Sequence, residues 1–205
     1  MSNGVPIISG PRPRAIAGGH AVRGVGVRAN SLVLALALAM PVIVHMAPWG
    51  GGMSLGAFLL PMFWAAFVAV YLYGIWPGLL VAVFGPVVNN FLTNFPELRI
   101  NTVLTFEVAV FVVFSWLVLR NPRGRAFWLL APLAYVVAKV CSCALIAAGV
   151  EIFGNMGVAT EFFARSVSRG APGLVVLAAI NFALVRGWIG SNGAGGGGHG
   201  PEAAA

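Results

Sequence analysis

Six runs of apolar residues, each close to twenty residues long, constrain this chain more than any other feature. They cover residues 31–49, 55–74, 79–95, 102–119, 126–149 and 171–188. A helix needs about 20 apolar residues to cross the ~30 Å hydrocarbon core of a bilayer, and a helix bonds its own backbone polar groups there. The pattern therefore predicts an all-α membrane protein with six transmembrane helices in a compact bundle.

The scarcity of charge excludes the soluble classes of protein. Only 8% of the 205 residues are charged, 60% are hydrophobic, and Asp is absent, whereas a soluble domain carries about 25% charged residues. The net charge of +7 would suit a nucleic-acid-binding protein, but the Arg residues lie between the apolar runs and not along one face. We therefore expect this chain to lie in a lipid bilayer and to bind no nucleic acid.

The basic residues also predict an orientation. If the amino terminus is cytoplasmic, eight Arg residues lie inside, at positions 12, 14, 23, 28, 120, 123, 125 and 186, and three lie outside, at positions 99, 165 and 169. The positive-inside rule then favours both termini in the cytoplasm. The expected location is a bacterial cytoplasmic (inner) membrane, crossed several times.

The two ends of the chain differ from its middle in composition. Residues 1–30 are rich in Arg, Gly and Pro without an acid, and residues 190–205 are rich in Gly. Such composition opposes a packed core. We expect a disordered basic tail at 1–30, a transmembrane domain at 31–189, and a flexible tail at 190–205.

Glu107 and Lys139 are the ionisable side chains placed well inside the predicted spans. A charge at the centre of a membrane helix costs at least about 2.5 kcal/mol, so it usually has a partner or a role. At 1.5 Å per residue, Glu107 lies ~8 Å and Lys139 ~15 Å from the outer ends of their spans. The two could meet in the outer leaflet, as a structural ion pair or as part of a solute site.

A polar stretch closes the third predicted span at the same depth. It comprises Asn89, Asn90, Thr93 and Asn94, which cover an arc of about 140° at 100° per residue. Facing lipid, each group would lack a partner, at a cost of ~1–3 kcal/mol. These side chains therefore line a cavity, bond to neighbouring helices, or do both.

The segment 151–169 joins the last two predicted spans and mixes aromatic with charged residues. Glu161 and Arg165 can pair at the i,i+4 spacing of a helix. The pattern predicts an interfacial helix over the outer mouth, acting as a lid or as a plain surface connector.

Several motifs of catalysis are missing. The sequence has no GxxxxGK[ST] or HExxH motif and no cluster of metal ligands, and these patterns mark nucleotide and zinc sites. We expect no enzymatic activity, no metal and no cofactor. If ATP powers transport, another subunit must supply it.

The stretch 59–114 resembles the substrate-binding (S) components of energy-coupling factor transporters. The matching features are Leu60-Pro61-Met62, the segment from Gly74 to Gly78, the segment from Pro86 to Pro96, and the intramembrane Glu107, and residues 170–185 are similar to the Pro-Gly-led last span of that family. Two positions depart from the pattern of that family. Asn94 stands where Gly is common, and Phe63 stands where a polar residue often follows Leu-Pro-Met.

The resemblance implies a six-helix subunit that captures a vitamin-like solute from outside. It also implies two kinds of partner, a transmembrane coupling subunit and two cytoplasmic ATPases. The family's coupling contact uses small residues of the first span, which maps to Ala35 and Ala39, four apart on one helix face. The candidate solute contacts are Asn89, Asn90, Thr93, Asn94, Glu107 and Lys139.

Two other functions are compatible with the same sequence. A six-span scaffold or assembly protein would use the polar groups only to hold its helices together. A facilitator that works without partners is the third possibility. A captured solute distinguishes the first hypothesis from the scaffold.

Overall fold

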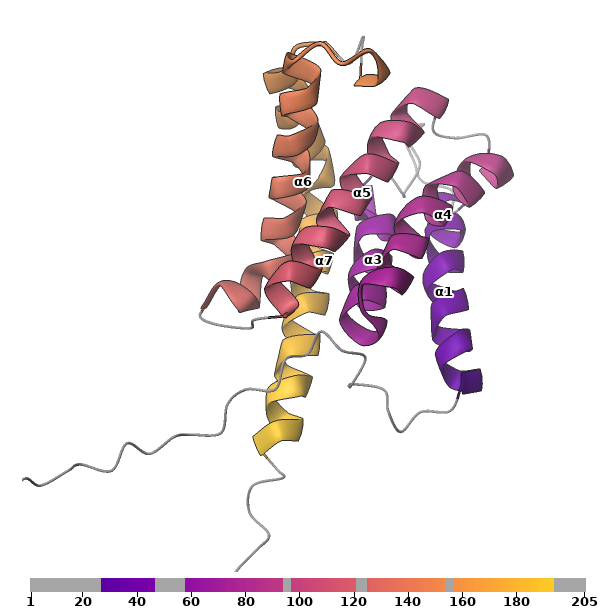
Figure 1. Ribbon diagram of the computed structural model, residues 1–205, viewed down its shortest axis with the longest axis vertical. Coiled ribbons are helices and arrows are strands. Elements are labelled where there is room, and N and C mark those ends of the chain that lie inside the picture. Colours follow the sequence, from indigo (N-terminus) through magenta and orange to yellow (C-terminus); the bar gives the residue numbers. More distant parts are fainter. Residues whose placement is uncertain (1–26, 47–57, 94–96, 121–124, 154–156, 194–205) are drawn as a thin grey trace, which may run out of the picture.

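The computed structural model describes residues 27–46, 58–93, 97–120, 125–153 and 157–193, and every regular element in these ranges is helical (Figure 1). The α-helices are α1 (Val27–Met46), α3 (Pro61–Tyr73), α4 (Ile75–Thr93), α5 (Leu98–Leu119), α6 (Leu130–Ala147) and α7 (Ala159–Gly193), with short 3₁₀ turns η2 (Arg125–Leu129) and η3 (Glu151–Phe153). The predicted all-α class is confirmed.

Four of the described helical segments are long and apolar enough to cross a membrane. They are Ile75–Leu92, Leu98–Leu119, Phe127–Ala147 and Ala159–Arg186. Helix α3 is apolar but has only 13 residues, or about 20 Å of helix. The structure thus supports a membrane-embedded protein, while the number of six spans stays a prediction.

Helix α3 is the centre of the bundle. It packs against α1, α4, α5, α6 and α7, and most of its side chains are buried. The ring of Phe63 lies edge-on to Phe111 of α5 and to Tyr135 of α6, with centroids 5.4 and 4.9 Å apart, a favourable aromatic geometry. A helix that is apolar on every side belongs in a protein interior, and here five neighbouring helices surround α3.

The turn between α3 and α4 is shorter than the sequence indicates. We expect the turn at Trp76-Pro77-Gly78, but the chain turns at Gly74, and α4 begins at Ile75. Gly74 has φ +93°, a conformation that glycine adopts without steric cost. Pro77 then lies in the first turn of α4, where a missing backbone N–H breaks no hydrogen bond.

The prediction of a separate interfacial helix in 151–169 is wrong for the described part of that segment. Residues 159–169 form the first third of α7, a continuous helix of 35 residues that runs through Pro172 and whose last part extends past the beginning of α6 (Figure 1). Proline usually kinks or breaks a helix, but membrane helices tolerate it where neighbours pack around the freed backbone groups. The expected pair of Glu161 and Arg165 is present, with Nη2 and Oε2 3.7 Å apart.

Two glycines fit α7 against the start of α3. A Cβ atom built on Gly173 would lie 2.6 Å from Cγ of Leu60 and 2.7 Å from the backbone of Leu59, and one built on Gly170 would lie 3.0 Å from the hydroxyl of Tyr135. Gly173 therefore has room only for a hydrogen atom, and Gly170 is in a tight contact. These contacts allow α7 to pack closely against the residues that precede α3 and against Tyr135.

The ends of the bundle lie a little outside the predicted bounds. Helix α1 begins at Val27, four residues before the first predicted span, and α7 ends at Gly193, beyond the last predicted span. The remainder of the predicted tails, residues 1–26 and 194–205, lies outside the described residues.

A pair of Gly→Ala variants tests this packing. Gly173→Ala should lower the free energy of unfolding by about 1–3 kcal/mol, the usual cost of overpacking, because the new methyl group meets backbone atoms. The control Gly85→Ala places its methyl group in open space within α4 and should be neutral or stabilising, since alanine favours a helix over glycine. Denaturant unfolding of the purified proteins in detergent measures both. Equal stability of the two variants would contradict the packing of α7.

Candidate binding cavity

A buried ion pair joins α5 to α6. Nζ of Lys139 lies 2.6 Å from Oε2 of Glu107, and these residues are only 7% and 1% exposed. The packing of α5 against α6, together with the length of the Lys139 side chain, brings the two charged groups into contact. The expected meeting of Glu107 and Lys139 is confirmed.

Aromatic rings surround the ammonium group of Lys139. Its Nζ lies 5.5 Å from the ring centroid of Tyr135 and 5.3 Å from that of Phe162, within the range of cation–π attraction. The hydroxyl of Tyr135 donates to the carbonyl oxygen of Ser166 at 3.3 Å. These contacts tie the first third of α7 to α6 beside the ion pair.

The carboxylate of Glu107 is only partly satisfied. Its Oε1 is buried and accepts no hydrogen bond from the described residues. Ser142 lies beside the carboxylate, but its hydroxyl donates to the carbonyl oxygen of Ala138. A buried acceptor without a partner costs about 1–3 kcal/mol, which reduces the stabilisation that the pair can give.

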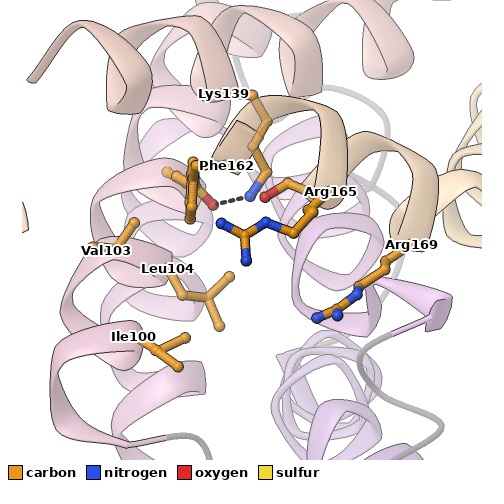
Figure 2. A pocket seen from close by; sticks show the side chains of 9 residues that line it. Ile100, Val103, Leu104, Lys139, Phe162, Arg165 and Arg169 are labelled. Carbon is orange, nitrogen blue, oxygen red and sulfur yellow. Dashed lines mark hydrogen bonds and ion pairs between the residues drawn. The ribbon is translucent and has the colours of Figure 1, made fainter. Parts of the chain in front are cut away.

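A cavity of about 370 Å³ adjoins this pair, between α5, α6 and α7. Figure 2 shows the apolar side chains of Ile100, Val103 and Leu104 on one side and Arg165 and Arg169 on the other, with Lys139 at its inner end. Each wall is one helix face with spacing i, i+3, i+4, i+7. The faces are Ile100, Val103, Leu104 and Glu107 on α5, and Phe162, Arg165, Ser166 and Arg169 on α7.

The two arginines differ in their partners. Nε of Arg165 donates to the backbone carbonyl oxygen of Glu161 at 3.4 Å, and the guanidinium group also faces the side-chain carboxylate of Glu161. Both contacts tie Arg165 to the preceding turn of α7. Arg169 forms no ion pair within the described ranges. The cavity therefore combines a buried neutral pair with an accessible positive charge.

The polar stretch of α4 lies apart from the cavity lining. Asn89 is fully buried and Asn90 half-buried, each interacts with other residues, and neither lines the cavity. The side chain of Thr93 and the whole of Asn94 lie outside the described residues. Of the four candidate contacts whose side chains the structure describes, Glu107 and Lys139 are brought together at the cavity.

Asn181, Ala35 and Ala39 do not line the cavity. Asn181 of α7 donates from Nδ2 to the carbonyl oxygens of Phe127 and Trp128, at 3.3 and 2.5 Å, and so holds α7 to the segment that precedes α6. Ala35 is exposed and Ala39 half-buried on α1, a helix that packs against α3 and α4. The exposed side of α1 is thus free of contacts from the described helices near Ala35.

Sequence reasoning missed the wall that α7 contributes. It treats Arg169 only as an outer basic residue and Arg165 as the partner of Glu161, because it places 151–169 on a separate connector. The signal that could have found the wall is the period of Phe162, Arg165, Ser166 and Arg169, which repeats the spacing of the α5 wall. Asn101, which is buried at 4% exposure on α5, also escaped notice.

Comparison with known proteins gives no relative. No protein family, no curated protein and no solved structure matches this chain.

A double-mutant cycle tests the ion pair. Glu107→Met or Lys139→Met alone should destabilise the protein by about 3–5 kcal/mol, because each leaves an uncompensated buried charge. The double variant removes both charges and should lose much less stability than the sum of the single variants. Denaturant unfolding in detergent measures the three values, and losses that simply add would show that the two residues do not interact.

Proposed function

We propose that this protein is the substrate-capture subunit of an importer of the energy-coupling factor type, binding a small vitamin-like solute in the α5–α6–α7 cavity. The observation that carries the proposal is an accessible cavity, at one end of a bundle of apolar helices, with a buried ion pair at its inner end. Binding sites commonly have a volume of about 300–1,000 Å³, mostly apolar walls and a few polar groups. The resemblance around Leu60-Pro61-Met62 and Glu107 points the same way.

The orientation of the bundle forms part of the proposal. Six helices cross a bacterial cytoplasmic membrane with both termini inside, as the distribution of Arg residues favours. The cavity then opens outward, because its lining comes mainly from the first half of α5 and the first third of α7. A subunit that captures solute from outside needs its site at this end.

The ion pair supports capture over a purely structural role. A buried pair often contributes no more stability than well-packed apolar side chains of the same volume, and Oε1 of Glu107 adds the cost of an unpartnered acceptor. Empty volume beside it also reduces packing energy. A scaffold would gain from filling this space, whereas a binding protein needs it open.

The partners follow from the same proposal. A transmembrane coupling subunit contacts the face of α1 that carries Ala35 and Ala39, where small side chains allow close approach of another helix, and two cytoplasmic ATPases supply the energy. The exposure of Ala35 suits such a contact. Copurification with a coupling subunit from the native membrane supports this part, and a chain that always purifies alone contradicts it.

Native mass spectrometry of the detergent-purified protein tests solute capture. The wild-type protein should carry one small molecule from rich growth medium. The double variant Glu107→Met/Lys139→Met, which leaves no uncompensated buried charge, should reduce its occupancy at least tenfold, because it removes the polar groups at the inner end of the cavity. The matched control is Val140→Met, at the neighbouring exposed position of α6, which should keep the ligand. Absence of any small molecule from all three proteins would favour the scaffold.

A further inference from the structure

We infer that the solute is a small monoanion, a carboxylate with an apolar body, and that Arg169 together with Arg165 binds its charged group. This inference rests on the proposed function and narrows it. The charged and apolar side chains that line the cavity support it.

The first step is the balance of charge around the cavity. Its cations are Lys139, Arg165 and Arg169, and the acids that face them are Glu107 and Glu161. Lys139 is neutralised by Glu107 at 2.6 Å, and Arg165 is partly neutralised by Glu161 at 3.7 Å. One positive charge remains, on Arg169, and a ligand with a single negative charge would balance it.

The second step is the separation of polar and apolar groups. The arginines enter from the α7 side, and Ile100, Val103 and Leu104 cover the opposite α5 side (Figure 2). A ligand must therefore offer a charged end to α7 and an apolar surface to α5. The ring of Phe162 adds apolar surface beside Lys139, which suits a hydrocarbon or aromatic body.

The third step is the fork geometry of arginine. A guanidinium group can give two parallel N–H bonds to a carboxylate, and Arg165 and Arg169 project one helical turn apart from the same face of α7. A cationic solute would meet like charges on this wall, and an uncharged one would leave Arg169 without a counter-ion. An anion therefore gains most from this wall.

An anionic group can also belong to a lipid headgroup. A lipid headgroup and a water-soluble acid both offer the anionic group that Arg169 would bind, so the experiment must distinguish them. A water-soluble acid is the occupant that we infer, because a capture subunit must take up its ligand from water.

Thermal-shift and calorimetric titrations of the purified protein in neutral detergent test the inference. The probes are four acids (biotin, pantothenate, nicotinate and 4-aminobenzoate), three uncharged compounds (riboflavin, pyridoxine and nicotinamide) and the cation thiamine. At least one acid should stabilise the wild-type protein. Arg169→Gln should weaken its binding at least tenfold, and Arg165→Gln should weaken it too.

The control Arg186→Gln changes an exposed arginine of the same helix that does not line the cavity, and it should leave binding unchanged. Binding of the acid should also weaken with rising salt, since the arginines are exposed and their charges are screened. The same loss of binding in Arg186→Gln would mean that overall charge, and not the cavity, attracts the anion, and would overturn the inference.

The outcomes separate the two proposals. If an uncharged or cationic probe binds and Arg169→Gln keeps its affinity, the monoanion inference is wrong while solute capture stands. If no probe of any charge stabilises the protein, both proposals fail. If phosphatidylglycerol in mixed micelles stabilises the wild-type protein but not Arg169→Gln, while phosphatidylcholine has no effect, a lipid headgroup is the occupant and the soluble acid is excluded.

Discussion

The buried contact between Glu107 and Lys139 is the interaction on which the arrangement of α5, α6 and α7 depends. Each charge alone would be costly at this depth in an apolar bundle, so each requires the other, and the two helices must pack in the one register that brings Nζ within 2.6 Å of Oε2. Lys139 also attracts the ring of Phe162, which fixes the first third of α7 beside it. The walls of the cavity follow from this register.

The centre of the bundle makes such a cavity possible. Helix α3 supplies an apolar core through Phe63 and Phe67, which contact Phe111 of α5, and Gly173 lets α7 lie close to the residues that precede α3. Rigid packing on that side leaves the opposite side of the α5–α6–α7 group open. A binding site is more precise when it is built on packed helices than on loops.

Much of the fold follows from the sequence because the bilayer imposes strict rules. Long apolar runs must form helices, so the helices can be predicted, and two isolated charges in the outward half of successive spans are expected to pair, as Glu107 and Lys139 do. The place of Asn89 relative to the cavity cannot be predicted in this way. Helix α4 packs against α1, α3 and α5, whereas the cavity lies between α5, α6 and α7, and this order of helices is not encoded in the apolar pattern. The α7 wall was missed because sequence reasoning places residues 151–169 on a separate connector, whereas residues 159–169 continue into α7.

The central claim is that the cavity opens to the outside of the cell and admits a solute, and cysteine labelling tests it most directly. Cys141 and Cys143 would be changed to Ala, and Ser166, in the cavity wall, would be changed to Cys. A membrane-impermeant maleimide should label Cys at position 166 in intact cells, and an added solute that binds should slow the labelling. Labelling only after the cells are broken open would contradict the orientation, and a rate that no solute changes would contradict capture in this cavity.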